Sequence, residues 1–474
     1  MESLVVDLPR IVPPTAPADE TTRRKLAKEI NGPLFVADLL LLRGIRGKEE
    51  ARAFFLPEPA PSSPQSFLNL ERAVTLLCEA RARGERVAVH GDYDVDGVTS
   101  TVILRRALEL LGGNVTHFIP ERFRDGYGLQ PASLDRLAAE GVRLVISVDC
   151  GIRGAEAGRR ARELGVDLII TDHHEPDEAL PPALAVINPK RSDCSYPDKH
   201  LAGVGVALKV VQAICARTSH TNWLPGFIKI AAIGTLADVV PLVGENRVIA
   251  KLGLDMLTRG PHKVGLRALL DVSGLSGKTI DSYHISCLLA PRMNAAGRMS
   301  NPDIATRLLL ANDEALADEA RALAQQLDAE NVRRQEEEAT ILAAAKKIVQ
   351  TDPEVGARSV LVVAGESWHR GVIGIVASKL VDAFHRPAIV LSIEGDTAHG
   401  SCRSIPSFDI LSALESASDL MIRFGGHKQA AGLTMDAARV RDLQTFLMVE
   451  TLRCSAIGFN ISRQYNAFVR GNRA

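Results

Sequence analysis

Three carboxylates and one imidazole lie within seven residues of one another in the segment His90–Gly97. The carboxylates belong to Asp92, Asp94 and Asp96. Like charges this close repel one another unless a cation lies between them, so the cluster predicts a metal site. Carboxylate and imidazole ligands without a thiolate favour manganese or magnesium over a structural zinc.

An EF-hand calcium loop is the main alternative for this cluster, because Asp-x-Asp-x-Asp-Gly opens such a loop. That loop needs a bidentate Glu at its twelfth position, where this chain has Ile103. It also needs a preceding helix, whereas the apolar residues Val87–Val89 predict a strand. Both differences argue against calcium.

Further candidate ligands follow other apolar segments. Leu144–Val148 and Leu168–Thr171 read as strands, and an apolar helix is expected before Gly234–Asp238. The candidate ligands at the ends of these elements are Asp149, Asp172, His173, His174 and Asp238. Each Asp alone could be a turn residue or a helix N-cap. Because ligands bind beyond the carboxyl ends of parallel strands, their coincidence favours one metal site at one sheet edge.

The elements that must position these residues form an α/β pattern. Short strands rich in β-branched residues alternate with helical patterns, which predicts a parallel sheet with helices on both faces. From Asn312 to Gln350 there is no Gly or Pro, which predicts one long bridging helix to a second α/β lobe. The expected organisation is 1–70 a partly helical lead, 71–310 the catalytic domain, 311–350 the connecting helix, 351–446 a substrate-binding domain and 447–474 an irregular tail.

Composition bounds the function only loosely. The chain has 474 residues, of which 46% are hydrophobic and 24% charged, as expected of a globular protein with no membrane partner. Its formal net charge of −1 gives no support for nucleic-acid binding by bulk charge, so such binding must rest on local contacts. Seven scattered cysteines predict reduced thiols and a cytoplasmic location.

Taken together, these residues resemble the DHH phosphoesterase family, named for Asp172-His173-His174. The similarity covers about residues 35–446 and is greatest to the bacterial single-strand exonucleases of that family. Further segments that carry it are Pro120–Arg122, Gly126–Leu129, Gly203–Ala207, Ala237–Leu242, Pro291–Arg298, Gly425–His427 and Ala430–Gly432.

The resemblance implies two divalent ions, Mn²⁺ or Mg²⁺, bridged by Asp149. It implies His90 and Asp94 as ligands of one ion, and Asp96, His173 and Asp238 as ligands of the other. Asp92 and His174 are expected to orient the substrate and assist catalysis. Two cations roughly 3.5–4 Å apart activate a water and neutralise charge on the attacking and leaving oxygens.

The second lobe resembles the substrate-binding module called DHHA1. Paired glycines beside a polar side chain, as in Gly425-Gly426-His427, allow the backbone to approach a phosphate closely, although a turn is the alternative. Ser401 and Arg403 add groups suited to a terminal phosphate. The remaining phosphate-binding candidates are Arg122, Arg292 and Arg298, for which structural ion pairing is the alternative.

By resemblance, the expected function is 5′-to-3′ hydrolysis of single-stranded DNA in repair and recombination. The expected enzyme is a monomer that works with a single-strand-binding protein and a helicase. The alternatives are an oligoribonuclease or small-nucleotide phosphodiesterase of the same family, and a scaffold that has lost its ligands. The exonucleases continue into an OB-fold domain, so a shortened or frame-altered end after residue 446 and weaker strand binding are also expected.

Overall fold

A computed structural model of the chain describes residues 18–57 and 64–456. The described residues divide into two compact units, one extending to Asn331 and the other beginning at Val332. Most of the predicted tail, residues 457–474, lies outside the described residues. In the part of the chain that is described, no helix is long and apolar enough to cross a membrane.

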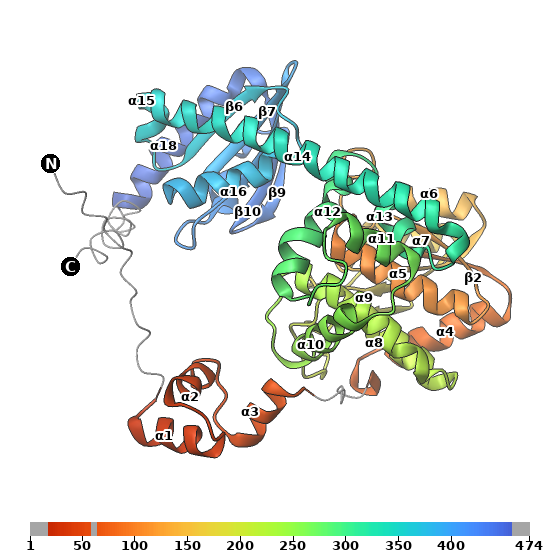
Figure 1. Ribbon diagram of the computed structural model, residues 1–474. Helices are drawn as coiled ribbons and strands as arrows, with labels where there is room; N and C mark the ends of the chain where they lie inside the picture. The colour runs from red at the N-terminus through yellow and green to blue at the C-terminus, as the bar shows by residue number, and fades with distance from the viewer. Residues whose placement is uncertain (1–17, 58–63, 457–474) are drawn as a thin grey trace. The chain divides into compact units, whose positions relative to one another are not determined.

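The first unit is built on a five-stranded parallel sheet (Figure 1). Its strand order is β2 (Asn114–Phe118), β1 (Arg86–His90), β3 (Val142–Val148), β4 (Asp167–Thr171) and β5 (Ala185–Ile187). Every neighbouring pair is parallel, so all five carboxyl ends lie at one edge. The predicted strands within β1, β3 and β4 are confirmed, because each is a β-branched run buried on both faces.

Helices cover both faces of this sheet. One face packs against α4 (Leu70–Ala82), α5 (Val95–Leu110) and α8 (Gly203–Arg217). The other face packs against α6 (Pro131–Ala139) and α7 (Ala155–Leu164). The predicted doubly covered α/β sheet is therefore confirmed.

A further helical layer packs on the outer side of α5. Its apolar core draws on α5 and on the helices that follow α8 along the chain. These helices are α9 (Leu224–Ala237), α10 (Gly244–Arg259), α11 (Val264–Val272), a π-helical turn (His284–Leu289), α12 (Ala290–Met299) and α13 (Asp303–Leu310). The amino-terminal helices are α1 (Glu20–Glu29), α2 (Leu34–Leu41) and α3 (Lys48–Phe55), and they enclose a small core of their own.

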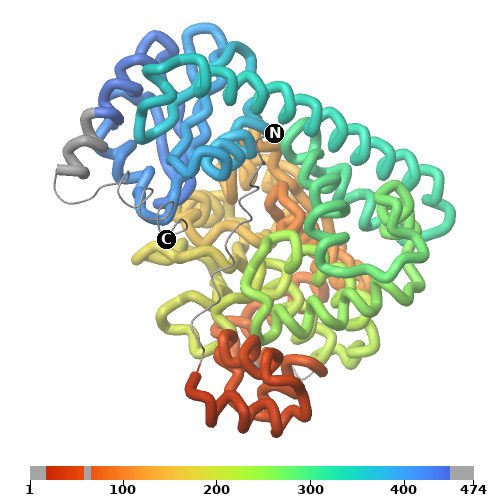
Figure 2. Tube along the Cα trace, turned by 60° about the vertical axis from the view of Figure 1, so that its left-hand side comes forward, coloured from red at the N-terminus to blue at the C-terminus, as the bar shows by residue number. Residues whose placement is uncertain are grey.

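The predicted bridging helix is α14 (Ala317–Thr351), a single helix of 35 residues (Figure 2). The boundary between the two compact units falls inside it. Leu323 and Leu327 on its first half belong to the core of the first unit, whereas Ile341 and Val349 are buried on its second half. The helix is continuous, but each half is stabilised by a different unit.

The second unit contains a mixed five-stranded sheet. Its order is β6 (Leu361–Glu366), β7 (Ala388–Glu394), β8 (Thr397–Arg403), β10 (Ala430–Asp436) and β9 (Arg423–His427). Only β6 and β7 are parallel, joined by α16 (Ile373–Phe384). The other helices are α15 (Pro353–Ala357), α17 (Ile410–Ser416) and α18 (Val440–Ala456). The apolar run Ser359–Val363 predicts a first strand of this unit, and the observed β6 begins two residues later. Helix α18 extends beyond residue 447, where the irregular tail was expected to begin.

Candidate metal centre

The carboxyl ends of three adjacent strands bring the candidate ligands together. His90 of β1 pairs with Ser147 of β3, and Val148 of β3 pairs with Thr171 of β4. The acidic segment after β1, Asp149 after β3 and the Asp-His-His segment after β4 therefore begin at nearly the same level of the sheet. Parallel pairing alone thus produces the concentration of carboxylates.

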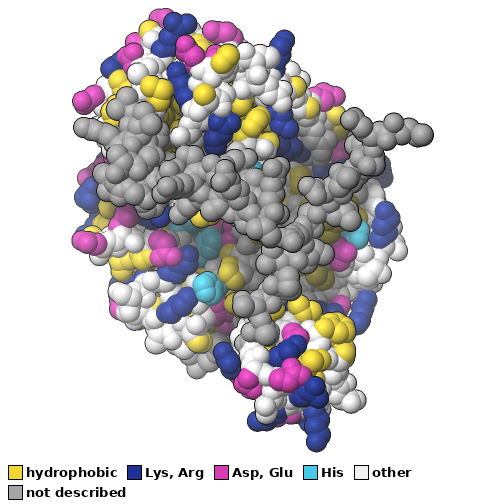
Figure 3. Space-filling model, turned by 90° about the vertical axis from the view of Figure 1, so that its left-hand side faces the viewer, with side chains coloured by type: hydrophobic (Ala, Val, Ile, Leu, Met, Phe, Trp, Pro, Cys, Tyr) yellow, Lys and Arg dark blue, Asp and Glu magenta, His cyan; other side chains and the backbone are white. Residues whose placement is uncertain are grey.

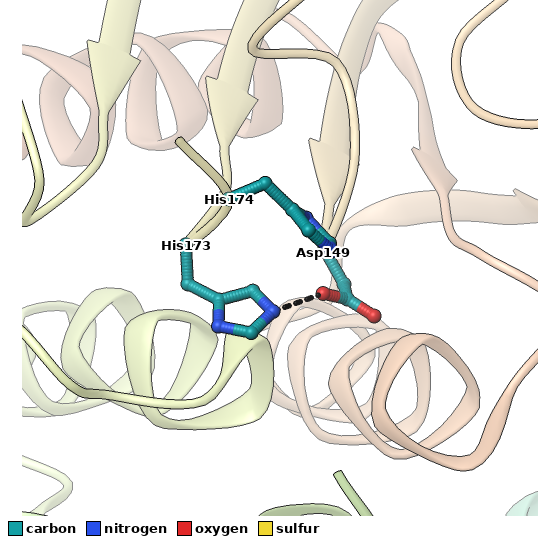
Figure 4. A group of neighbouring side chains, drawn as sticks. All are labelled: Asp149, His173 and His174. Carbon is teal, nitrogen blue, oxygen red and sulfur yellow. Dashed lines mark ion pairs between the residues drawn. The ribbon is translucent and has the colours of Figure 1, made fainter. Parts of the chain in front are cut away.

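The ligand atoms form three overlapping groups, in each of which they lie within 4.8 Å of one another. Asp149 belongs to two of these groups and His173 to two. The groups are Asp149 with His173 and His174, Asp96 with His173 and Asp238, and Asp92 with Asp94 and Asp149. In Figure 4 the side chains of Asp149 and His173 point toward each other, with His174 beside them.

Asp96 is oriented by the start of α8. Its two carboxylate oxygens accept hydrogen bonds from the backbone N–H groups of Gly203 (2.7 Å) and Val204 (2.8 Å). The positive end of the helix dipole favours a negative charge there. A Cβ at Gly203 would lie 2.5 Å from Oδ1 of Asp149, so only glycine fits between the two carboxylates. This close approach explains the first glycine of the Gly203–Ala207 motif.

Asp149 and His173 present their atoms to a common point. Asp149 is 2% exposed and has a left-handed backbone with φ of 59°, a conformation that Asp tolerates better than most residues. Its Oδ1 lies 3.1 Å from Nε2 of His173, yet the arrangement lacks hydrogen-bond geometry. Burial, together with the neighbouring charge of His174, lowers the pKa of His173 to about 4. The imidazole is therefore neutral near pH 7, the form that binds metal.

Asp172 orients His174 and lies in none of the three groups. It accepts hydrogen bonds from the backbone N–H groups of Ile152, His173 and His174, and its Oδ1 is 2.7 Å from Nδ1 of His174. Burial acts against these contacts, but the hydrogen bonds prevail: the pKa of Asp172 is lowered and that of His174 is raised. The side chain of His174 is 42% exposed, so its ring is accessible to a substrate.

His90 is not brought into these groups. It is fully buried, with Nδ1 3.7 Å from Sγ of Cys150 and with no hydrogen-bond partner for Nε2. Burial lowers the pKa of His90 to about 4, so the ring is neutral. Its role as a metal ligand remains a prediction. A buried nitrogen without a hydrogen-bond partner is consistent with that role, because a bound cation would satisfy it.

The acidic side chains are costly to bury together. Burial, followed by repulsion from Asp94, raises the pKa of Asp92 to about 8. Burial and neighbouring carboxylates raise the pKa values of Asp96 and Asp149 well above their usual range, and that of Asp238 to about 6. Divalent cations would reverse this penalty, so the donor set fits them.

The three candidate arginines of this unit have different surroundings. The guanidinium of Arg122 lies 5.5 Å from the ring centroid of Tyr93, within the acidic segment. Arg298 is close enough to act electrostatically on the Tyr93 hydroxyl. Arg292 forms a 2.8 Å ion pair with Asp328 and donates to the carbonyl of Leu288, which matches the structural alternative. Its phosphate contact remains a prediction.

Four of the five candidates of the second unit lie on one face of its sheet. Ser401 and Arg403 are two residues apart on β8, so their side chains lie on the same face of the sheet. Through the intervening strand β10, Ser401 is in register with Gly425 of β9 and Arg403 with His427, so these residues share that face. Gly426 faces the opposite side. The glycine pair lies in a strand, so the turn alternative is wrong. An N–H group of Arg403 donates to Ser401 Oγ (3.3 Å) and to the carbonyl of Cys402 (2.8 Å).

The sequence assigned no role to three groups that contact the acidic segment or act on the centre electrostatically. These are the backbone amides at the start of α8, the amide side chain of Asn294, and Lys190. Lys190 forms a 3.1 Å ion pair with Glu175, and its charge acts on His173 and Asp238. The Gly203 motif signalled the first group, whereas Lys190 carries no motif.

The face drawn in Figure 3 does not carry a single dominant charge. In Figure 3 Lys and Arg side chains are interspersed with Asp and Glu over the visible face, and histidine side chains appear among them. This distribution agrees with the formal net charge of −1. Recognition of a polyanion must therefore rest on local groups such as the arginines above.

Comparison with known proteins places the chain in a family. Residues 86–235 match the family model described as DHH family, N-terminal domain, and residues 357–449 match the DHHA1 domain. The chain is 39% identical to the single-stranded-DNA-specific exonuclease RecJ of Bacillus subtilis over 435 residues, 90% of this chain and 54% of that protein. It is 37% identical to RecJ of Salmonella typhimurium over 400 residues, 80% of this chain and 68% of that protein.

Solved structures agree with this assignment. Crystal structures of RecJ from Thermus thermophilus in complex with Mn²⁺ and with Mg²⁺ superpose with TM-scores of 0.78 and 0.72. Their sequence identities are 35% and 33%, and the match covers 92% of this chain and 61% and 59% of those chains. The chain thus spans about half the length of its Bacillus subtilis relative. By its two matched domains and its 37–39% identity to RecJ proteins, the chain belongs to the RecJ family of DHH proteins.

Proposed function

We propose that this protein is a 5′-to-3′ exonuclease that hydrolyses phosphodiester bonds of single-stranded DNA with two divalent ions, Mn²⁺ or Mg²⁺. The observation that carries the proposal is the set of three overlapping groups of ligand atoms that share Asp149 and His173. The names of its relatives, single-stranded-DNA-specific exonucleases, and the ions in the Thermus structures support it.

The donor set is suited to two cations. Asp94 and His90 would hold one ion, Asp96, His173 and Asp238 the other, and Asp149 would bridge them. Buried atoms without a hydrogen-bond partner occur on both His90 and Asp149, as such a site requires. When bound, two divalent ions activate a water molecule and neutralise charge on the oxygens that attack and leave.

The side chains of the protein supply orientation and proton transfer. Asp172 holds His174 through Nδ1, which leaves Nε2 of His174 to donate to a phosphate oxygen. The raised pKa of His174 favours this protonated form. The pKa of about 8 keeps Asp92 largely protonated at neutral pH before cations bind. Once ionised, its carboxylate would accept a hydrogen bond from the substrate or from water.

Phosphate contacts are proposed for both units. In the second unit Ser401, Arg403, Gly425, Gly426 and His427 would receive the terminal 5′ phosphate, since Arg and Ser side chains on one face suit a phosphate dianion. In the first unit Arg122, Arg292 and Arg298 would contact phosphates near the scissile bond. Holding the 5′ end at the second unit would set the direction of digestion.

An assay with end-labelled oligonucleotides tests the proposal. Single-stranded DNA labelled at the 5′ or the 3′ end is incubated with Mn²⁺, with Mg²⁺ and with chelator, alongside equivalent RNA and dinucleotides. We expect metal-dependent release of 5′-labelled mononucleotides from DNA. Asp149→Asn, which tolerates the same backbone conformation, should abolish release without loss of thermal stability.

Each contrary outcome identifies a rival. Degradation confined to RNA or dinucleotides would instead indicate an oligoribonuclease or a small-nucleotide phosphodiesterase. Release that continues in chelator, or that survives in Asp149→Asn, would contradict the metal mechanism. No hydrolysis of any substrate, together with no binding of Mn²⁺ or Mg²⁺, would favour the scaffold alternative.

A further inference from the structure

The helix α12 contacts the acidic segment directly. Oδ1 of Asn294 accepts a 3.2 Å hydrogen bond from the backbone N–H of Val95. Val95 lies between Asp94 and Asp96, two candidate ligands that the proposal assigns to different ions. One side chain from a helix 199 residues away in sequence thus fixes the peptide between them.

This N–H has no partner within its own helix. Val95 is the first residue of α5, and the first N–H groups of a helix lack intrahelical acceptors. Asp94 caps the helix by accepting from the N–H of Gly97 at 3.0 Å, which leaves the N–H of Val95 to Asn294. Val95 is 1% exposed, so water does not readily replace the amide oxygen.

A second contact from the same helix fixes its distance from the segment. Gly297 lies three residues after Asn294 and therefore on the same side of α12. A Cβ at Gly297 would lie 2.6 Å from the carbonyl oxygen of Tyr93. The helix therefore packs against the backbone of the acidic segment itself, with no side chain between them.

The same helical segment also contacts the end of α9, two residues before Asp238. It begins with the π-helical turn His284–Leu289, and π-helical turns occur frequently at functional sites. The hydroxyl of Ser286 in this turn donates a 2.9 Å hydrogen bond to the carbonyl of Leu236. Leu236 lies two residues before Asp238, at the end of α9.

We propose that Asn294 and Ser286 are positioning residues, through which one helical segment sets the separation between the acidic segment and Asp238. The assignment rests on the proposed metal site for its functional meaning. It accounts for the Pro291–Arg298 motif beyond its two arginines. Asn294 acts through Asp94 and Asp96, and it need not touch substrate.

Replacing Asn294 tests this role through metal binding and not only through activity. Asn294→Leu removes the acceptor at similar volume, whereas Asn294→Asp keeps an acceptor at the same place. Asn312→Leu is the control. Asn312 is also half-buried, and its side-chain amide donates a hydrogen bond to the carbonyl of Leu310, not to the acidic segment. Mn²⁺ affinity is measured by electron paramagnetic resonance on the full chain, and amide exchange is followed over residues 91–98 without metal.

We expect Asn294→Leu to weaken Mn²⁺ binding about 10- to 100-fold, the usual effect of removing a group that orients a ligand. Exchange at Val95 should accelerate in the same variant. Asn294→Asp should stay within a few-fold of the wild-type affinity, and Asn312→Leu should leave both readings unchanged. Ser286→Ala, which removes a single hydroxyl at the Asp238 side, should weaken Mn²⁺ binding several-fold and is informative even if Asn294→Leu fails to fold.

Wild-type affinity in Asn294→Leu or in Ser286→Ala would overturn the positioning role, as would equal losses in Asn294→Leu and Asn294→Asp. The failure of the proposed function is distinguishable. If wild-type protein binds Mn²⁺ but hydrolyses no nucleic acid, while Asn294→Leu loses affinity, positioning stands and the exonuclease proposal falls. If nuclease activity is present and the variants bind Mn²⁺ normally, the reverse holds.

Discussion

Two adjacent histidines end up with opposite electrostatic properties at the residue scale. The pKa of His173 is lowered to about 4 by burial and by the charge of His174, whereas contact with Asp172 raises that of His174 against the effect of burial. His173 is suited to bind a cation and His174 to carry a proton. The sequence Asp-His-His gives no indication of this division, because it depends on which ring faces Asp172.

His174→Gln should therefore separate chemistry from metal binding. We expect kcat to fall by about 10²- to 10⁴-fold, the usual contribution of general acid–base catalysis, with Mn²⁺ affinity kept within a few-fold. Steady-state kinetics and Mn²⁺ titration of the same preparation measure both. His173→Gln serves as the comparison and should lose Mn²⁺ affinity first. A matching loss of affinity in His174→Gln would instead make His174 a ligand, as its place in one of the three groups allows.

The metal-free protein should lose stability between pH 6.5 and pH 8. His90 and His173 keep pKa values of about 4 in the folded state against 6.5 when unfolded, so their contribution to stability rises with pH only up to about 6.5. Asp92, with a folded pKa of about 8 against 3.8, retains a proton that the unfolded chain has lost. Its contribution therefore falls as pH rises, and above pH 6.5 it is unopposed by those histidines.

Thermal unfolding in chelator across this range measures the effect, which should appear as a falling Tm. Added Mn²⁺ should raise Tm more at pH 8 than at pH 5, because at pH 8 fewer protons must be displaced from the carboxylates when the ion binds. In Asp92→Asn the decline in chelator should be smaller. A Tm that does not fall between pH 6.5 and pH 8 in chelator would contradict the raised pKa of Asp92.

The sequence predicts the candidate ligands that follow apolar elements, but it does not predict the groups that orient these ligands. Asp149, His173 and Asp238 each follow a recognisable apolar element, so their convergence could be predicted. The hydrogen bond from the N–H of Val95 to Asn294 joins residues 199 positions apart, and no local sequence pattern predicts this pairing. For His90, position in the cluster suggested a ligand, whereas its place at the end of a buried strand directs the ring toward Cys150.

At the scale of elements, the start of α8 shows how a helix determines a site. Its first two N–H groups hold Asp96, and the missing side chain of Gly203 gives Asp149 room. The strands predicted within β1, β3 and β4 begin within two residues of the observed ones. The Gly425-Gly426 pair was harder to interpret, because glycine signals turns and close approaches alike; only strand pairing across β10 decides between them.

Gly203→Ala should disable the centre while leaving the fold in place. The added methyl would lie 2.5 Å from Oδ1 of Asp149, so the carboxylate must move away from His173. We expect Mn²⁺ affinity to fall by at least about 10-fold, in line with other changes that reorient a ligand. The control is Gly226→Ala in α9, where a Cβ meets no heavy atom within 4 Å and alanine should stabilise the helix. Equal affinities in the two variants would contradict the close approach.

At the scale of the whole molecule, the metal centre and the polar sheet face belong to different compact units. Arg403→Ala should therefore raise KM for single-stranded DNA without changing Mn²⁺ affinity. Loss of one charge-assisted contact costs about 1.5–3 kcal/mol, or roughly 10- to 150-fold in KM. Steady-state kinetics with 5′-phosphorylated and 5′-hydroxyl oligonucleotides test this, and the penalty should largely disappear with the 5′-hydroxyl substrate. An equal penalty on both substrates would place Arg403 elsewhere along the strand.

Because α14 contributes to both units, neither unit can be exchanged between related proteins without part of this helix. Leu323 and Leu327 belong to the core of the first unit, whereas Ile341 and Val349 are buried in the second. A chimaera of two related proteins that is joined before or after the helix therefore packs half of α14 against a unit from the other protein. A junction near Asn331 and Val332 would keep each apolar stripe with its own partner. Recombination between related genes should therefore yield functional chimaeras most often when the crossover falls in the middle of this helix.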